Sequence, residues 1–435
     1  MHNELKSGEF WREIPGFSSI SEETFLDPNW QLHHAITSIP MAEAALKGRD
    51  IPPAVFADLA KAQQVVPMNI RITPYIFSLM NWKDPQKDPL RRMFFPMFSQ
   101  LILENHAMTL SDSLSEDEDS PASQLTHRYP DKALFLALAI CPTYCSYCTR
   151  ARLIGGSTQT VQKKTAAFAP KAGKWESAFN YIQETKSLED IVISGGDVSL
   201  LSAEDIYYIG TKLLSIPHIR RIRYATKSII VNPMKILNDN DWVDAIFRVR
   251  DFGLPLDKSV VIHTHSSHPS ELTEITQRAM RRLFRERLIV RNQGVLLNQV
   301  NNSAENLTLH VRRLSYLNIQ PYYFYQHDMV PGCEHLRTPL HETIMLEKAV
   351  RGSTAGFNTP NFVCDLPRGG GKRHVATYEK YDRLTGISMW QAPAVKNKIF
   401  FYFDPLHSLS AEGQRLWRET DAQSLIEQTM GVAYA

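Results

Sequence analysis

Three cysteines lie in one short stretch of this 435-residue chain, Cys141-Pro-Thr-Tyr-Cys145-Ser-Tyr-Cys148. The spacing CxxxCxxC brings three thiolates to one point in a compact loop. Iron–sulfur clusters are held by cysteine thiolates, and a four-iron cluster with three protein ligands keeps one iron open to a small molecule. The motif therefore predicts a [4Fe-4S] cluster that acts on a bound ligand, held by Cys141, Cys145 and Cys148.

A zinc site or a disulfide framework is less consistent with the number and spacing of the cysteines. A structural zinc ion takes four ligands, and the remaining cysteines, Cys333 and Cys364, are distant and have no CxxC partner. Five cysteines in 435 residues are sparse and odd in number, which argues against a secreted disulfide framework. Burial of unrelated thiols in the core is the remaining alternative.

A glycine turn, Ser194-Gly195-Gly196-Asp197, follows the apolar run Ile191–Ile193. Glycines let the backbone approach a ligand closely, and a carboxylate can accept hydrogen bonds from an ammonium group. Such strand-to-helix turns are common, so this one indicates a ligand site mainly because it follows the cysteine motif.

A second glycine-rich motif, Asp365-Leu-Pro-Arg-Gly-Gly-Gly-Lys372, ends in a lysine. A lysine in a flexible turn can reach a carbonyl and form a Schiff base, which is the chemistry of pyridoxal phosphate (PLP) enzymes. A phosphate-binding or merely flexible loop is the alternative. A Walker motif is excluded because neither Ser nor Thr follows the lysine.

The secondary-structure elements that position these residues are expected to alternate between strands and helices. Residues 1–110 read as helical, and the acidic, serine-rich stretch 111–123 reads as an exposed loop. From Ala133 on, six apolar runs alternate with helical stretches, which predicts an α/β fold with a parallel sheet in a partial (β/α)6 barrel. The runs are 133–140, 191–193, 222–224, 260–262, 288–290 and 321–325, and the helical stretches include 203–214, 274–287 and 304–317. The candidate residues that fall at carboxyl ends of these runs are Cys141, Ser194, His265, Gln293 and Asp328.

Composition indicates the general class of the protein and its expected location in the cell. Hydrophobic residues make up 43% and charged residues 22% of the chain, as in soluble globular proteins. The net charge of +2 gives no reason to expect a nucleic-acid partner. The start of the chain lacks the pattern of a signal peptide, and no apolar run reaches the length of a membrane span. We therefore expect a cytoplasmic protein without a membrane partner.

Taken together, the motifs give a specific resemblance. The cysteine spacing is similar to that of the radical S-adenosylmethionine (SAM) enzymes, and the set of motifs resembles the lysine 2,3-aminomutase family of PLP-dependent radical SAM enzymes over roughly residues 28 to 400. The motifs that carry this resemblance are 127–132, Cys141 to Arg150, Ser194–Asp197, Thr264-His265-x2-His268-Pro269, Asn292-Gln293, Gln326-x-Asp328, 334–339 and Asp365–Lys372.

The resemblance implies three regions and a set of cofactor contacts. Residues 1–110 would be a helical N-terminal region, 111–340 the radical SAM partial barrel, and 341–435 a C-terminal extension with the PLP lysine and an assembly role. Lys372 would be catalytic, as the Schiff-base lysine. The open iron would chelate SAM, with Ser194, Gly195, Gly196 and Asp197 near its amino group, while Arg128, Tyr129 and Lys132 match the PLP-phosphate region and His265 and Gln293 further cofactor contacts.

The substrate residues follow from the same resemblance. Arg150 would pair with the substrate carboxylate, although an internal salt bridge is its alternative role, and Asp328 with Asp365 would receive a distal ammonium group. The family activity is isomerisation: L-lysine would become the β-amino acid β-lysine. Arginine would also satisfy two carboxylates, so an arginine 2,3-aminomutase of a specialised biosynthetic pathway is the alternative. A radical SAM enzyme without PLP that modifies a peptide or RNA is a further one.

The chain also departs from the family pattern. Its tail, residues 401–435, lacks the zinc-binding cysteines of clostridial-type lysine enzymes. Arg368 stands where the family usually has glycine, and Asn298 also differs, so we expect these two residues to reshape the substrate pocket. The remaining implied partners are an electron donor such as flavodoxin or ferredoxin and a second copy of the chain in a homodimer or homotetramer.

Overall fold

Nine strands form one sheet in strict sequence order in the computed structural model, which describes residues 1–104, 106–164 and 175–432. Strands β2 to β8 run parallel, and the edge strands β1 and β9 pair antiparallel with their neighbours. The strands are β1 (Leu125–Tyr129), β2 (Lys132–Leu138), β3 (Asp190–Gly195), β4 (Arg221–Ala225), β5 (Ser259–Thr264), β6 (Ile289–Val295), β7 (Gln320–Tyr325), β8 (Asn361–Leu366) and β9 (Gly371–His374).

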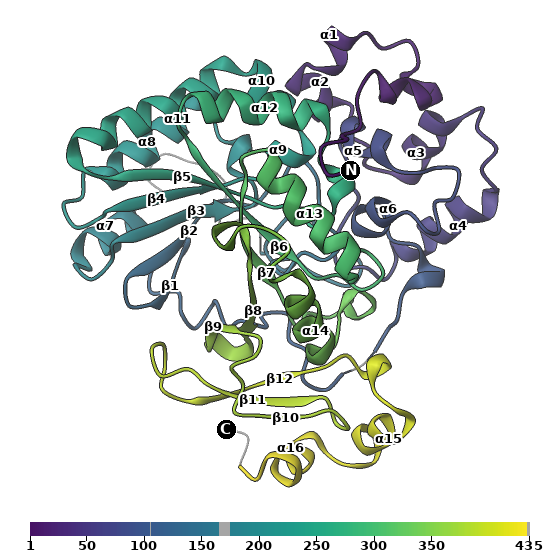
Figure 1. The fold of residues 1–435 in the computed structure, drawn as a ribbon, viewed down its shortest axis with the longest axis vertical. Coiled ribbons are helices and arrows are strands. Elements are labelled where there is room, and N and C mark those ends of the chain that lie inside the picture. The colour runs from purple at the N-terminus through teal and green to yellow at the C-terminus, as the bar shows by residue number, and fades with distance from the viewer. Residues whose placement is uncertain (105, 165–174, 433–435) are drawn as a thin grey trace.

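Helices connect the parallel strands and cover one face of the sheet (Figure 1). This βα alternation confirms the α/β partial barrel expected from the apolar runs. The six expected strands are β2 to β7, and the structure adds a seventh parallel strand, β8. The connecting helices are α7 (Glu176–Glu184), α8 (Ala203–Leu214), α9 (Ser228–Val231), α10 (Met234–Asn238), α11 (Asn240–Gly253), α12 (Glu274–Arg285), α13 (Ala304–Tyr316) and α14 (Leu340–Val350).

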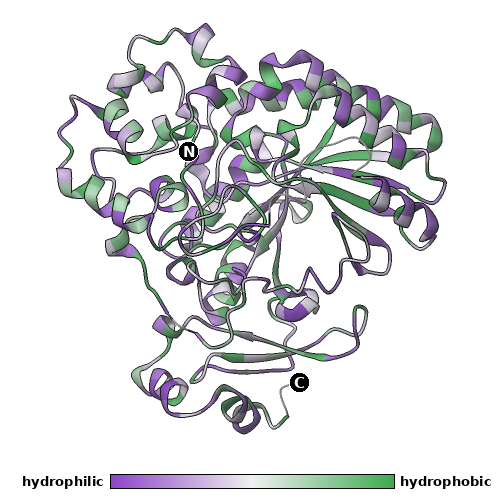
Figure 2. Cartoon of the chain, turned by 180° about the vertical axis from the view of Figure 1, so that it is seen from behind, coloured by the Kyte–Doolittle hydropathy of each residue, from purple (hydrophilic) through white to green (hydrophobic). Residues whose placement is uncertain are grey.

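The core lies between the sheet and these helices. Strands β2 to β5 are buried over most of their length, as expected for parallel strands covered by helices. The outer helices alternate apolar and polar positions, and Figure 2 shows green concentrated on the strands while purple recurs on the helices. Helix α12 shows how an end is fixed, since the Thr273 side chain accepts hydrogen bonds from the backbone N–H groups of Ile275 and Thr276.

The N-terminal region packs against the barrel as a layer of short helices (Figure 1). Most of these helices start with proline in the first turn, where its missing N–H costs nothing. The helices are α1 (Glu22–Phe25), α2 (Pro28–His33), α3 (Ile39–Leu46), α4 (Pro53–Ala62), α5 (Pro74–Leu79) and α6 (Pro89–Phe94).

The end of the chain forms a separate small sheet below the barrel in Figure 1. Its antiparallel strands are β10 (Lys380–Asp382), β11 (Ile387–Gln391) and β12 (Ile399–Phe403), followed by α15 (Ala411–Glu419) and α16 (Ala422–Met430). Strands β8 and β9 precede this unit and belong to the barrel sheet, although they follow the boundary expected at residue 340. In the part of the chain that the structure describes, no helix is long and apolar enough to cross a membrane.

Candidate active site

One cavity of about 530 Å³ runs along the inner side of the partial barrel. It extends from the cysteine loop (residues 140–149) to the glycine turn before Lys372. Every residue predicted from the sequence to contact a cofactor or substrate lines this cavity: Arg128, Tyr129, Lys132, Cys141, Cys145, Cys148, Arg150, Ser194, Gly195, Gly196, Asp197, His265, Gln293, Asp328, Asp365 and Lys372.

The three cysteines lie at one end of the cavity, just after β2, and are partly buried. Burial raises the pKa of all three thiols, to about 11 for Cys145, so a cation is needed to hold them as thiolates. No three His, Cys, Asp or Glu side chains of the described residues are gathered as ligands of a single metal ion. In a four-iron cluster each thiolate binds a different iron, so its ligands stand further apart. Three thiols that line one end of a cavity are the kind of donor set that an iron–sulfur cluster takes.

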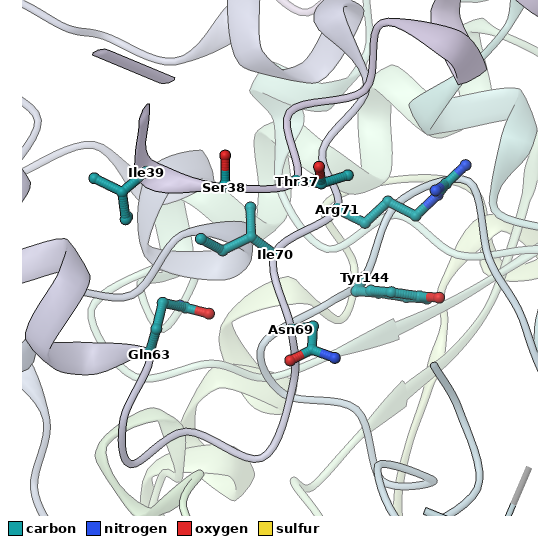
Figure 3. A pocket seen from close by; sticks show the side chains of 8 residues that line it. All are labelled: Thr37, Ser38, Ile39, Gln63, Asn69, Ile70, Arg71 and Tyr144. Atoms are coloured by element: carbon teal, nitrogen blue, oxygen red, sulfur yellow. The ribbon is translucent and has the colours of Figure 1, made fainter. Parts of the chain in front are cut away.

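The helical N-terminal region holds the cysteine loop from outside. The backbone N–H of Tyr144 donates to the carbonyl of Arg71 at 2.8 Å, and that of Ser146 donates to the carbonyl of Met93 at 2.9 Å. A second pocket, of about 460 Å³, lies on this side, and Figure 3 shows Tyr144 beside Asn69 and Arg71 in its wall. Because Tyr144 also lines the main cavity, the N-terminal region borders the predicted cluster site.

The glycine turn after β3 is packed against the cysteine loop. A Cβ on Gly195 would lie 2.2 Å from the carbonyl oxygen of Leu138, and one on Gly196 would lie 2.1 Å from that of Ile140. Both contacts are far inside van der Waals distance, so only glycine fits at either position. These glycines therefore let the turn approach the start of the cysteine loop.

Asp197 accepts hydrogen bonds from its own turn and from the turn after β4. Its carboxylate accepts hydrogen bonds from the Thr226 hydroxyl at 2.6 Å, the Lys227 N–H at 2.7 Å and the Ser199 N–H at 2.9 Å. Burial raises its pKa, while these bonds oppose the shift. The side chain thus ties the turn after β3 to the turn after β4.

At the other end of the cavity, Lys372 and Asp365 form an ion pair with an Nζ–Oδ2 distance of 2.8 Å. The two residues are direct cross-strand partners in the β8–β9 pair. Burial alone would lower the pKa of Lys372, but Asp365, with Tyr325 and Tyr129, raises it well above its ordinary value. The ammonium group of Lys372 therefore occupies the position beside Asp365 that a substrate ammonium is expected to take.

Asp328 lies three residues after β7 and lines the same end of the cavity. Burial, together with the neighbouring Asp365, raises the pKa of Asp328 to about 7, while Lys372 and Arg150 oppose this. Two carboxylates that share a low-dielectric site cannot both stay ionised without a cation. The pair is therefore suited to a ligand that brings a positive charge.

The aromatic and histidine residues of the cavity are arranged around these charges. Tyr129 accepts a hydrogen bond from the backbone N–H of Lys372 at 2.9 Å, and Tyr325, at the end of β7, also lines the cavity. His265 Nε2 lies 2.8 Å from the Tyr147 hydroxyl. Burial, with Lys227 nearby, lowers the pKa of His265 to about 3, so this imidazole is neutral.

Of the residues matched to the PLP phosphate, Arg128 already has hydrogen-bond partners within the protein. Arg128 donates from Nε to Asp119 at 2.7 Å and also binds the carbonyl of Leu114. Lys132 is more open, with 37% of its side chain exposed and its ammonium 4.1 Å from the ring centre of Tyr129. Lys132 is therefore the more available cation of the two.

The expected loop at residues 111–123 is a loop in the structure, but it is exposed only in part. Residues 112–119, here called the acidic strap, lie against the cavity, and Glu116 is only 5% exposed. Glu116 binds Arg150, while Asp112 and Asp117 bind Arg152. Composition alone indicated a solvated loop, whereas the arginines after the cysteine motif are the signal that could have revealed these ion pairs.

Two residues expected to reshape the pocket lie outside it. Neither Arg368 nor Asn298 lines the cavity. Arg368 is exposed in a left-handed conformation with φ 59°, which explains why glycine suits this position. Asn298 donates to the carbonyl of His335 at 3.2 Å. Any influence of these residues on substrate choice is thus indirect.

Comparison with known proteins identifies the class of enzyme. No family model matches the chain. The chain is 34% identical over 359 residues to an L-lysine 2,3-aminomutase of Clostridium subterminale, covering 82% of this chain and 80% of that protein. It is 28% identical over 332 residues to a glutamate 2,3-aminomutase of Clostridioides difficile, covering 75% and 72%. A radical SAM methyltransferase structure from Sphaerobacter thermophilus has a TM-score of 0.34 at 18% identity, over 55% of this chain and 68% of that one, which is too low to bear on the fold.

Aminomutases are isomerases, and the protein is an enzyme of this class. The chain belongs to the lysine 2,3-aminomutase family.

Proposed function

We propose that the protein is a PLP-dependent radical SAM 2,3-aminomutase that moves the α-amino group of a basic L-amino acid to the β-carbon, with L-lysine as the first candidate. The observation that carries this proposal is the pairing of Lys372 with Asp365 in a cavity that also contains Asp328 and Arg150. A carboxylate-binding cation and two ammonium-binding carboxylates in one cavity match the two charged ends of a dibasic amino acid.

Three sets of residues would hold the three cofactors. Cys141, Cys145 and Cys148 would hold the [4Fe-4S] cluster, the turn Ser194–Asp197 would lie beside SAM, and Lys372 would attach PLP with Lys132 near its phosphate. The bound cluster and SAM would supply a radical that removes hydrogen from the β-carbon, while PLP would carry the amino group during its transfer.

The other residues act on the substrate. Arg150 would hold the α-carboxylate, and Asp328 and Asp365 would hold the distal ammonium group. Lys372 must lose its proton to act as a nucleophile, and the adjacent Asp365 is the group that keeps it protonated beforehand. A reductant such as flavodoxin or ferredoxin would deliver the electron, and we propose a homo-oligomeric assembly.

The test is a direct assay of product. The protein is purified anaerobically, reconstituted with cluster and PLP, and given lysine or arginine with SAM and a reductant, with omission of SAM as the control. Mass spectrometry after chiral derivatisation identifies each β-amino isomer. β-Lysine is expected, and β-arginine alone would move the substrate while keeping the reaction. Cleavage of SAM without either product would contradict the proposed substrate class, and absence of a PLP absorbance band would contradict the cofactor.

A further inference from the structure

The acidic strap contributes one carboxylate directly to the proposed substrate cavity. Glu116 accepts hydrogen bonds from Arg150 Nε at 3.1 Å to each carboxylate oxygen and from Arg150 Nη2 at 2.7 Å. Its side chain is 7% exposed, whereas that of Arg150 is 27% exposed. Glu116 therefore holds one edge of a guanidinium group whose remaining surface is accessible.

Arg150 still has donors to offer. A guanidinium group carries five N–H donors in a fixed plane, and Glu116 engages those of Nε and part of Nη2. Among the described residues, none accepts a hydrogen bond from Nη1 of Arg150. The edge between Nη1 and Nη2 can thus take a second carboxylate in bidentate geometry.

A second arginine lies beside Glu116. Arg152 Nη2 lies 3.6 Å from Glu116 Oε2, and Arg152 also binds Asp112 and Asp117. Burial would raise the pKa of Glu116, but Arg150 and the neighbouring arginines lower it instead. Glu116 is therefore ionised and remains a fixed anion behind Arg150.

The geometry points to Glu116 as a positioning residue that orients Arg150 toward the substrate carboxylate. This inference rests on the proposed function, because it assumes that Arg150 binds the α-carboxylate of a basic amino acid. It assigns a specificity role to a segment whose composition indicated only a solvated loop.

The test compares Glu116→Gln with Glu118→Gln, a matched control two residues away whose side chain is exposed. Glu116→Gln should raise KM for the basic amino acid about 10- to 100-fold with kcat changed less than about threefold, as expected for loss of a charge-assisted contact. Glu118→Gln should behave as wild type. An unchanged KM in Glu116→Gln would overturn the inference.

A second measurement separates positioning from general structural damage. Dissociation constants are measured for lysine and for lysinamide, which lacks the α-carboxylate, in wild type and in each variant. Loss of Glu116 should reduce the preference for lysine over lysinamide by about the same 10- to 100-fold and leave lysinamide binding nearly unchanged. Equal weakening of both ligands would contradict positioning of Arg150.

Two further results distinguish failure of this inference from failure of the proposed function. If Glu116→Gln does not fold, Glu116→Asp keeps the charge on a shorter side chain and should show a smaller loss of the same preference; a wild-type preference in Glu116→Asp would then refute the inference. Wild type that binds and converts neither lysine nor arginine would refute the proposed function. Active wild type together with an unaffected Glu116→Gln would refute only the role of Glu116.

Discussion

Replacing Asp328 with asparagine should remove a pH dependence from the binding of a basic amino acid. Burial and the neighbouring Asp365 raise the pKa of Asp328 to about 7. A ligand ammonium group favours the ionised carboxylate, so binding below this pKa must expel a proton. The affinity of the wild-type enzyme should therefore fall as the pH falls through 7.

The size of the effect follows from the fraction of Asp328 that is protonated. With a pKa of about 7, the apparent dissociation constant exceeds its limiting value by about 1.1-fold at pH 8 and by about 11-fold at pH 6, a change of about tenfold. In Asp328→Asn this dependence should vanish, and binding at pH 8 should weaken by about 10- to 100-fold through loss of a charge-assisted contact.

The assay is isothermal titration calorimetry in buffers of different ionisation enthalpy, with PLP bound and SAM omitted so that no turnover occurs. Norleucine serves as the control ligand, because it has the same α-amino and carboxylate groups but no distal ammonium. Relative to norleucine, lysine should release about 0.9 additional protons at pH 6 and about 0.1 at pH 8 in wild type, and none in Asp328→Asn. Equal proton release for the two ligands, or an unchanged pH dependence in Asp328→Asn, would refute the assignment of Asp328.

Three more perturbations address the cluster, the cofactor lysine and the fold. Gly196→Ala places a Cβ 2.1 Å from the carbonyl oxygen of Ile140, so iron content after reconstitution should drop while PLP is retained; full iron content would contradict the packing argument. Lys372→Ala should lose the PLP absorbance band on gel filtration, and a retained band would exclude covalent attachment at this lysine. Thr273→Ala removes the N-cap of α12 and a 2.7 Å hydrogen bond with Tyr75, so the free energy of unfolding in denaturant should decrease by about 1–3 kcal/mol; no decrease would show that the cap is dispensable.

The parts of the site that the sequence predicted are those encoded locally. The cysteine spacing and the glycine turn each follow an apolar run, and parallel strands bring their carboxyl ends to one edge. The βα alternation was therefore enough to predict that these motifs lie in one cavity, without any information on contacts between distant residues.

The interpretations that were wrong or incomplete depend on distant partners. Glu116 and Asp117 of the acidic strap bind arginines that follow the cysteines, and composition does not reveal which charges meet. Asp197 is directed by Thr226 and Lys227, which belong to the next strand turn. Strand β8 was missed as part of the sheet because its residues, Asn361–Leu366, were assigned to the C-terminal extension that begins at residue 341. Tertiary contacts decided each of these cases.

The β8–β9 hairpin has a consequence for how substrate preference changes during evolution. Asp365 and Lys372 are joined by a turn in which Arg368 and Gly369 both have positive φ, at 59° and 83°. Inserting or deleting one residue there would shift the register and turn one of the two side chains to the opposite face. The length of this turn therefore keeps Asp365 and Lys372 together as neighbours, and we expect both to be retained as a pair. Asp328 lies on a separate loop, so we expect new substrate preferences in descendants of this protein to arise at position 328 before position 365.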